Sequence, residues 1–422
     1  MKETASRKVV VMGQGYVGLP LAVSAVEAGH AVIGYEPESS RLARLRSGRS
    51  YVEDIGSDRL SAALAAGYRP TDDPSTLAGF DVAIIAVPTP LRERTPDLRA
   101  VAEASATIGA HLRPGATVVL ESTTYPGTTE EVVGPILERS SGLCPGRDFH
   151  LGYSSERIDP GNRTWTLVNT PKLVSGVDET SLKTIADFYS SFVEVVVPVS
   201  RPAVAELAKL VENTFRHVNI ALVNELAMFA DELGIDVGEA IEAAATKPFG
   251  FMRFDPGPGV GGHCLPIDPT YLSWRVRTSL NRSFRFVDLA NDINDHMPEY
   301  VARRVGQALN RRRQSLNGAR VLIVGLAYKR NSGDCRESPA LALAARLSAA
   351  GAVVAGADPH VVEGLGLPGL NRVPLSVAEL AAADAVVLVT DHDAFDLELI
   401  RAHARFVFDT RRRLHGPNVE AL

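Results

Sequence analysis

The chain has 422 residues, well above the roughly 150 residues of a typical single domain, so we expect two or three domains. Hydrophobic residues make up 45% of it and charged residues 22%, which excludes a disordered, collagen-like or coiled-coil protein. A net charge of -6 without Lys/Arg runs predicts no nucleic-acid partner. Three cysteines, an odd number, predict free thiols and a cytoplasmic location. The chain shows no apolar run of about 18 residues and no signal-peptide pattern, so we expect no membrane association.

The first predicted elements form a strand–helix–strand unit. A β-branched strand at 8–13 runs into GQGYVG at 13–18, a helix is predicted over 19–29, and a second strand at 31–36 ends on Glu36. In this context G-x-G-x-x-G is typical of dinucleotide binding, because its glycines permit the turn, the approach to a pyrophosphate and the packing of the helix. Apolar runs at 82–87 and 117–120 extend a doubly wound sheet, and a polar segment at 152–162 follows a further strand.

Glu36 bears on the choice of cofactor. A carboxylate at the end of the second strand accepts hydrogen bonds from the adenine-ribose hydroxyls and repels a 2′-phosphate, so Glu36 favours NAD over NADP. Arg41 argues the other way, because a nearby Arg can accommodate that phosphate. The alternative is that the three glycines serve only to pack the helix on the sheet. Their position between a strand and a helix disfavours this interpretation.

One long amphipathic helix is predicted from 201 to about 233, where apolar residues recur at three-to-four spacing. It lacks sustained heptads, which favours a spine or a subunit interface over a coiled coil. Lys209 and Asn213 share one face of this helix, but with Glu206 and Glu212 nearby the charge pattern alone favours a solvated stripe of ion pairs.

Cys264 follows the glycine- and proline-rich run PGPGVGG at 256–262, and we predict that it lies on a loop close to that turn. A partly exposed thiol in polar surroundings, with Asp268 shortly after it, is a candidate nucleophile. The alternative is a small buried hydrophobic side chain. No second Cys/His cluster with ligand spacing is present, so we predict no metal site.

A second α/β unit is predicted toward the C-terminus. Strands are expected at 320–325, 352–357, 385–389 and 405–408, and a helix opened by Ser-Pro over 338–350. The predicted fold class is therefore α/β, with two Rossmann-like doubly wound domains joined by a central helical region.

Seven segments in order resemble the UDP-glucose/GDP-mannose dehydrogenase family, the NAD-dependent nucleotide-sugar 6-dehydrogenases. They are GQGYVG, AVPTP at 86–90, ESTTYPGTT at 121–129, YSSERIDPGN at 153–162, AELAKLVENTFR at 205–216, PGPGVGGHCLPIDP at 256–269 and VLIVGLAYKRNSGDCRESPA at 321–340. The resemblance implies an NAD-binding domain over 1–200, a central helical dimerisation domain with the catalytic Cys loop over 201–300, and a UDP-sugar-binding Rossmann-like domain over 301–422. It also implies a homodimer or a higher homo-oligomer.

The resemblance further implies residue roles. For catalysis it implies Cys264 as nucleophile together with Lys209, Asn213, Asp268, Glu156 and Thr124, whose acid–base roles stay undivided. For NAD, the fingerprint and the resemblance together indicate Gly13, Gly15, Tyr16, Val17, Gly18, Glu36, Arg41, Pro88, Thr89, Thr124 and Arg336. For the substrate it implies Glu156, Arg157, Lys209, Asn213, Arg216, Asn219, Phe249, Phe251, Gly261, Tyr328 and Lys329.

The implied activity is a four-electron oxidation of the C6 hydroxyl of a UDP-sugar through a Cys264 thiohemiacetal and thioester. The segments KPFGFMRFDPGPGVGGHCLPIDPTYLSW and ENTFRHVNI most resemble the branch that acts on UDP-N-acetylhexosamines such as UDP-GlcNAc, with UDP-glucose as the alternative. We expect Arg216, Asn219 and Arg253 to contact the sugar and to contribute to the choice of sugar. The chain departs from the family's usual residues at Glu36 (usually Asp), Ser155 (usually Pro) and Arg253 (usually small or Pro). Two other classes stay open: a two-electron dehydrogenase of the hydroxyacid type and a catalytically silent nucleotide-binding subunit.

Overall fold

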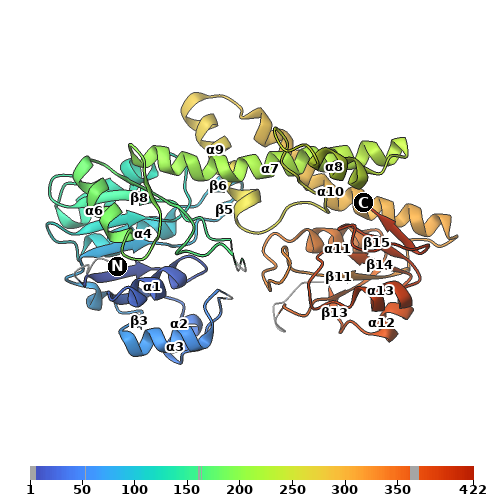
Figure 1. Cartoon of the computed structure of the whole chain (residues 1–422), viewed down its shortest axis with the longest axis horizontal. Helices are drawn as coiled ribbons and strands as arrows, with labels where there is room; N and C mark the ends of the chain where they lie inside the picture. The colour runs from blue at the N-terminus through green and yellow to red at the C-terminus, as the bar shows by residue number, and fades with distance from the viewer. Residues whose placement is uncertain (1–5, 53, 160–161, 163, 362–369) are drawn as a thin grey trace. The chain divides into compact units, whose positions relative to one another are not determined.

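Two compact units make up the chain in the computed structural model, which describes residues 6–52, 54–159, 162, 164–361 and 370–422. The first unit contains Met1–Glu212 and Thr270–Asn281, and the second contains Asn213–Pro269 and Arg282–Leu422. Two helices contribute to both units: α7 (Pro202–Leu233) and α9 (Cys264–Leu280) (Figure 1).

An eight-stranded sheet is the centre of the first unit, in the order β10-β9-β8-β7-β4-β1-β2-β3. Neighbouring strands are parallel except β8 and β9, which are antiparallel. The strands are β1 (Lys8–Met12), β2 (Ala31–Tyr35), β3 (Arg69–Thr71), β4 (Val82–Ile85), β7 (Thr117–Leu120), β8 (His150–Ser154), β9 (Lys172–Gly176) and β10 (Val196–Pro198). A separate short hairpin joins β5 (Leu91–Arg92) to β6 (Thr95–Pro96).

Both faces of this sheet are covered by helices. Val9 and Val11 of β1 belong to one buried cluster, while Val10 and Met12 belong to another, as the two-residue period of a strand requires. This is why the central strands are continuous apolar runs rather than alternating ones. The helical segments of the unit are α1 (Gly18–Glu27), α2 (Ser39–Arg46), α3 (Ser57–Ala66), η1 (Pro74–Leu77), α4 (Arg99–Gly109), η2 (Thr129–Val133), α5 (Gly134–Ser141) and α6 (Glu179–Tyr189).

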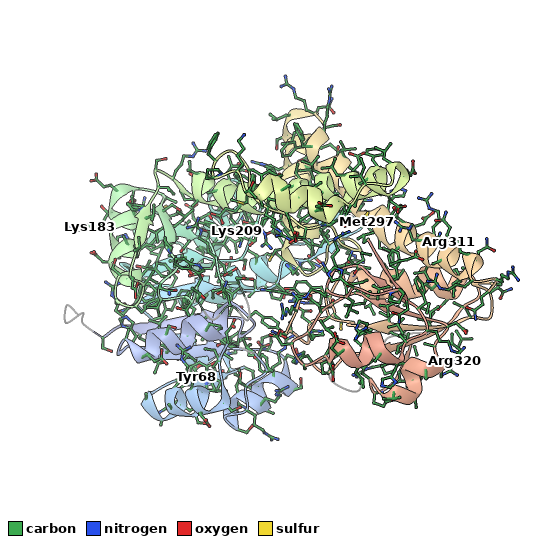
Figure 2. The ribbon with its side chains drawn as sticks, turned by 45° about the vertical axis from the view of Figure 1, so that its right-hand side comes forward. Tyr68, Lys183, Lys209, Met297, Arg311 and Arg320 are labelled. Atoms are coloured by element: carbon green, nitrogen blue, oxygen red, sulfur yellow. The ribbon has the colours of Figure 1, made fainter. Side chains whose placement is uncertain are left out.

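A six-stranded, all-parallel sheet is the centre of the second unit, in the order β13-β12-β11-β14-β15-β16. Met297 of α10, labelled in Figure 2, packs in the cluster on one face with Val321, and Leu322 belongs to the cluster on the other face. The strands are β11 (Arg320–Val324), β12 (Val353–Ala357), β13 (Asn371–Arg372), β14 (Ala385–Leu388), β15 (Val407–Asp409) and β16 (Val419–Ala421). The helices are α8 (Val237–Ala245), α10 (Arg285–Arg311), α11 (Pro339–Ala349), α12 (Val377–Ala382) and α13 (Leu397–His403).

The predicted α/β class with two parallel-sheet regions is confirmed, and local chemistry explains the element ends. The strand predicted over 82–87 stops at Ile85 because the N–H of Val87 donates to Ser122 Oγ at 2.9 Å and leaves the ladder. The helix predicted from 338 begins with Ser338 as its cap, whose Oγ accepts from the N–H of Ala340 at 3.3 Å. The short strands β3, β10, β13 and β16 and the antiparallel β9 were not predicted, because few residues define each of them.

Candidate active site

The turn after β1 places glycines where a side chain would collide. Gly13 has a φ of +87°, and a Cβ there would lie 2.5 Å from the carbonyl oxygen of Ala86. A Cβ on Gly18 would lie 1.9 Å from the carbonyl oxygen of Gly13. A Cβ on Gly15, in contrast, would meet no heavy atom within 4 Å. The backbone at Gly15 therefore faces open space beside the start of α1, which fits the approach of the NAD pyrophosphate.

Glu36 lies directly after β2 and is 4% exposed. Its Oε2 accepts from the N–H of Gln14 and its Oε1 from the N–H of Glu38, each at 3.1 Å. Each carboxylate oxygen has a second acceptor position, so the oriented carboxylate fits a ribose diol. Arg41 instead pairs with Glu38 at 2.9 Å, on an exposed part of the helix α2. These contacts fit NAD.

The segments after β4 and β7 follow the carboxyl ends of neighbouring strands. The second of them carries Thr124, which is fully buried and whose Oγ1 has no hydrogen-bond partner among the described residues. A buried hydroxyl without a protein partner is uncommon and indicates contact with a ligand or a water molecule. Pro88 and Thr89 follow β4, and the carbonyl of Thr89 accepts from the Tyr271 hydroxyl at 3.0 Å.

Lys209 and Glu156 form a buried pair in the first unit. Lys209, labelled on the ribbon in Figure 2, is 5% exposed, and its Nζ lies 3.6 Å from Oε2 of Glu156. The interpretation of this helix face as a solvated stripe is wrong, because the neighbouring Glu206 is also fully buried. Glu206 accepts from the N–H of Thr129 at 2.9 Å and from its hydroxyl at 2.7 Å, which ties α7 to the ESTTYPGTT segment. A buried cation of this kind can stabilise an oxyanion.

A second buried ion pair, which the sequence did not reveal, supports the Glu156 segment. Lys172 Nζ lies 3.0 Å from Oε2 of Glu121 and donates to the carbonyl of Ser155 at 3.4 Å. The Tyr189 hydroxyl donates to the other oxygen of Glu121. Burial raises the pKa of Glu121, although Lys172 and Tyr189 act against that shift. Its position in ESTTYPGTT was the one available signal, and Lys172 had none.

Arg157 is held by two hydrogen-bond acceptors from other parts of the chain. Its Nε donates to Glu212 of α7 at 3.0 Å and its guanidinium donates to the carbonyl of Pro171 at 2.7 Å. Its predicted substrate contact stays a prediction. Pro160 and Gly161, which complete the YSSERIDPGN motif, lie outside the described residues.

Cys264 is the first residue of α9, and it is exposed. The prediction of a loop position is wrong, because the helix begins at Cys264, two residues after Gly262, which has a φ of +81° and lies in the turn. Pro266 is compatible with this start, since an N–H in the first helical turn would have no partner within the helix. The partial positive charge of a first helical turn favours an anion such as a thiolate, which suits a nucleophile.

Asn213 and Asp268 lie together in the second unit. The Asn213 amide nitrogen donates to Oδ2 of Asp268 at 2.6 Å, and the two residues are 5% and 1% exposed. Asp268 is on α9, one helical turn after Cys264, and so belongs to the helix that the thiol begins. An amide NH₂ has two donors, so Asp268 orients an amide that can also donate to an oxyanion.

His263 was not singled out from the sequence, although it immediately precedes Cys264. Burial and the nearby Arg336 charge lower its pKa to about 4, while Asp334 acts in the opposite direction. The imidazole is therefore neutral near pH 7, and so low a pKa makes it a weak base. The motif GGHC was the available signal.

The residues before Cys264 pack closely on the loop that follows β11. A Cβ on Gly261 would lie 2.7 Å from Cβ of Tyr328, and one on Gly262 would lie 2.6 Å from the Tyr328 ring. The N–H of Gly262 donates to the carbonyl of Arg336 at 2.9 Å. Tyr328 and Lys329 are thus next to the thiol-bearing segment. Arg336 forms an ion pair with Asp334 at 2.6 Å, and its predicted contact with NAD stays a prediction.

The residues expected to contact the sugar are exposed or bonded to other groups of the protein. Arg216 is exposed, the amide of Asn219 donates to the carbonyl one turn back on its own helix at 2.7 Å, and Arg253 pairs with two carboxylates, the nearer at 2.9 Å. The predicted phenylalanines are well exposed, Phe249 at 70% and Phe251 at 41%. Their roles in binding stay predictions.

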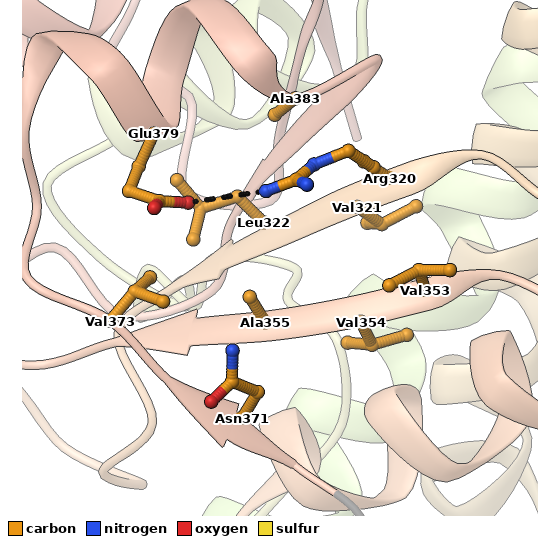
Figure 3. Close-up of a pocket in the computed structure, with 10 residues that line it drawn as sticks. All are labelled: Arg320, Val321, Leu322, Val353, Val354, Ala355, Asn371, Val373, Glu379 and Ala383. Atoms are coloured by element: carbon orange, nitrogen blue, oxygen red, sulfur yellow. Dashed lines mark ion pairs between the residues drawn. The ribbon is translucent and has the colours of Figure 1, made fainter.

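A pocket in the second unit lies at the amino ends of the strands, away from the carboxyl ends that Tyr328 and Lys329 follow. Figure 3 shows it at the first residues of β11 and β12, with an ion pair of 3.6 Å between Arg320 and Glu379. Ligands of open parallel sheets bind outside the carboxyl ends of the strands. Tyr328 and Lys329 follow that carboxyl end, so we do not assign the pocket to the substrate.

Across the part of the chain that the structure describes, no cluster of three or more His, Cys, Asp or Glu side chains could hold a metal ion. Within the same residues, no helix combines the length and the apolar character needed to cross a membrane. Cys144, Cys264 and Cys335 are free thiols.

Comparison with known proteins identifies relatives along nearly the whole chain. Three domain models of the UDP-glucose/GDP-mannose dehydrogenase family match it in order: the NAD binding domain over 7–193, the central domain over 203–296 and the UDP binding domain over 322–416. The chain is 37% identical to UDP-N-acetyl-D-mannosamine dehydrogenase of Pyrococcus horikoshii, over 92% of this chain and 90% of that protein. It is 36% identical to UDP-N-acetyl-D-glucosamine 6-dehydrogenase of Pseudomonas aeruginosa, over 92% and 91% of the two chains. The solved structure of the UDP-D-ManNAc dehydrogenase from Pyrococcus horikoshii matches with a TM-score of 0.89 at 34% identity, covering 98% of each chain. The resemblance inferred from the seven motifs is confirmed.

Proposed function

The chain belongs to the UDP-glucose/GDP-mannose dehydrogenase family, and from this membership we propose that it oxidises the C6 hydroxyl of a UDP-N-acetylhexosamine to the carboxylate, with two NAD reduced per sugar. The names of the two relatives, which specify UDP-N-acetyl sugars, support this substrate class. UDP-N-acetylglucosamine is our first candidate, and UDP-glucose is the alternative. The observation that carries the chemistry is the thiol at the first turn of α9, one turn before the Asp268 that holds Asn213.

The oxidation removes four electrons from C6. NAD, when bound, accepts a hydride from C6 in each of two oxidation steps. After the first, C6 is an aldehyde, and Cys264 Sγ forms a bond to it, giving a thiohemiacetal that keeps the aldehyde in the site. Loss of the second hydride leaves a thioester. Water then breaks the C–S bond, so that one sugar and one water yield a carboxylate, two NADH and three protons, and the thiol is restored.

We assign the remaining roles by charge and burial. The Lys209 cation stabilises the oxyanions that form when the thiol and then water attack C6, since a buried charge acts strongly there. The Asn213 amide, oriented by Asp268, is a further donor able to hydrogen-bond to an oxyanion. Glu156 and the buried Thr124 hydroxyl hold the attacking water.

The sugar preference is tested with a panel of UDP-GlcNAc, UDP-ManNAc, UDP-GalNAc and UDP-glucose. A site built for an N-acetyl group leaves its polar partners unpaired with UDP-glucose, which costs about 1–3 kcal/mol per group. We therefore expect kcat/KM for one N-acetylhexosamine to exceed that for UDP-glucose by at least about tenfold. Arg216→Ala should lower the ratio of kcat/KM for the N-acetylhexosamine to kcat/KM for UDP-glucose. Equal efficiencies that Arg216→Ala leaves unchanged would contradict this interpretation of the sugar pocket.

Glu36 should set the preference for NAD. Replacing its carboxylate by Ser removes the repulsion of a 2′-phosphate, so Glu36→Ser is expected to narrow the NAD-to-NADP ratio of kcat/KM by about tenfold or more. Glu103→Ser, a change at an exposed position of α4, is the matched control and should leave the ratio unchanged. Equal wild-type efficiencies with both cofactors would overturn the role of Glu36.

We propose that α7 forms the interface of a homodimer. Large apolar side chains along this helix are exposed to solvent. They include Val211, which is 55% exposed, Leu222 at 52% and Phe229 at 54%. A symmetric copy would cover such a face. Light scattering should give a dimer for the wild type and a smaller species for Phe229→Asp. Val353→Asp, an equally apolar exposed position on β12, should leave the dimer intact, and a monomeric wild type would refute the interface.

We place the enzyme in the cytoplasm. All three cysteines are free, and the proposed chemistry requires Cys264 as a thiol. A reducing compartment keeps such thiols available.

A further inference from the structure

Tyr328 and Lys329, the predicted nucleotide contacts, lie between two backbone anchors in the loop after β11. On the N-terminal side, one carboxylate oxygen of Asp358, which follows β12, accepts from the N–H of Leu326 at 2.7 Å and of Ala327 at 3.0 Å. On the C-terminal side, Nδ1 of His392 accepts from the N–H of Asn331 at 2.9 Å. The backbone of the loop is therefore fixed by hydrogen bonds on both sides of the Tyr328–Lys329 pair.

The two anchors form a single buried unit. His392 Nε2 lies 2.9 Å from the same oxygen of Asp358, and both side chains are 0% exposed. Since Nδ1 accepts a backbone N–H, we place the ring proton on Nε2, where it is donated to Asp358. Burial acts to raise the pKa of Asp358, but the hydrogen bonds from His392 and from the N–H groups of Ala327 and His360 prevail and hold it at about 2. The pair is thus an imidazole that donates from Nε2 to an ionised carboxylate.

The turn at Asn331 is held by further hydrogen bonds. Asn331 has a φ of 58°, in the left-handed region that most side chains avoid but that Asn adopts more readily. Its amide donates to Oδ2 of Asp393 at 2.6 Å, and its carbonyl oxygen accepts from the N–H of Asp393 at 2.9 Å. These contacts fix the side chain of Asn331, while His392 accepts the hydrogen bond from its backbone N–H. Loss of the ring acceptor would leave the backbone after Lys329 with fewer restraints.

We propose that His392, supported by Asp358, is a positioning residue that holds the Tyr328–Lys329 loop in the geometry that binds the nucleoside diphosphate of the substrate. A loop that is ordered before binding loses less conformational entropy on binding, so the anchor acts on affinity rather than on the chemical step. The inference rests on the proposed function, because it takes UDP as the ligand of this loop.

Two isosteric variants separate the anchor from general stability. In His392→Gln the side-chain amide nitrogen can reach the place of Nε2 and donate to Asp358, but nothing accepts the N–H of Asn331. In His392→Asn the amide oxygen takes the place of Nδ1 and keeps that acceptor, while the donor to Asp358 is lost. Each variant loses one buried hydrogen bond, so their melting temperatures should fall by similar amounts.

The measurements are UDP titration calorimetry and steady-state kinetics on the full chain. His392→Gln should raise the Kd for UDP and the KM for the UDP-sugar by about tenfold, with kcat and the Kd for NAD within about twofold of wild type. His392→Asn should bind UDP nearly as the wild type does. His360→Gln is the matched control, because His360 is exposed, touches the His392 ring and holds Asp358 through its backbone alone. Equal losses in both His392 variants, or none in His392→Gln, would overturn the positioning role. A wild type that binds no UDP would instead overturn the proposed function.

Discussion

Replacing Cys264 by Ser is expected to lower steady-state NADH formation by at least about 100-fold, equivalent to roughly 2.7 kcal/mol of barrier. A serine hydroxyl is a far weaker nucleophile at neutral pH, so the aldehyde is not captured for the second oxidation. The side chain lies at the first turn of α9 and is exposed, so its replacement should disturb neither folding nor binding. Titration should therefore give Kd values for NAD and UDP within about twofold of wild type.

Cys144→Ser is the matched control for this variant. The Cys144 thiol donates to Glu138 at 3.1 Å in the first unit, and we assign it no chemistry. Its loss should leave the rate near that of the wild type. More than about a tenth of the wild-type rate in Cys264→Ser would argue against covalent catalysis.

Lys209→Ala is expected to lower kcat by about 100-fold or more, the scale of losing an oxyanion donor. The cation is 5% exposed, and its Nζ lies 3.6 Å from Glu156, so its charge is little screened by solvent. Lys209→Arg keeps the charge and should recover part of the rate. The rate must be measured per folded molecule, because removing the cation also leaves Glu156 without its buried partner.

Lys183, labelled in Figure 2 on α6, provides the comparison for Lys209. It is exposed, and Lys183→Ala should leave kcat unchanged. If Lys209→Ala lowered only the melting temperature and kept kcat, the cation would be structural and the oxyanion role would be wrong.

The periodicity of the sequence predicted the fold well because each element is a continuous pattern. Buried parallel strands such as Val82–Ile85 are uninterrupted apolar runs, and α7 shows a helical repeat from end to end. The glycine fingerprint was equally predictable, since steric contact excludes a side chain at Gly13 and Gly18. Short strands and the exact ends of strands and helices depend on single hydrogen bonds, such as that from Val87 to Ser122. The sequence pattern does not reveal such bonds.

Burial of charge was the main feature that the sequence did not reveal. Glu206, Lys209 and Glu121 look like ordinary surface charges in a linear pattern, and only tertiary contacts bury them. The hydrogen bonds that organise the site also join distant residues, since Asn213 and Asp268 are 55 positions apart and Asp358 and His392 are 34 apart. The helix α9 starts at Cys264, two residues after the turn residue Gly262, and the sequence indicated that turn but not the start of the helix.

The most direct test of the proposed chemistry is the number of NADH formed per molecule of UDP-sugar consumed, measured on the wild-type protein with its preferred substrate. Capture of the aldehyde by Cys264 predicts two NADH and one uronic acid for each sugar, with no free aldehyde in solution. One NADH with release of an aldehyde would identify a two-electron dehydrogenase, and no NADH with any UDP-sugar would identify a catalytically silent nucleotide-binding subunit. Either result would contradict covalent four-electron oxidation.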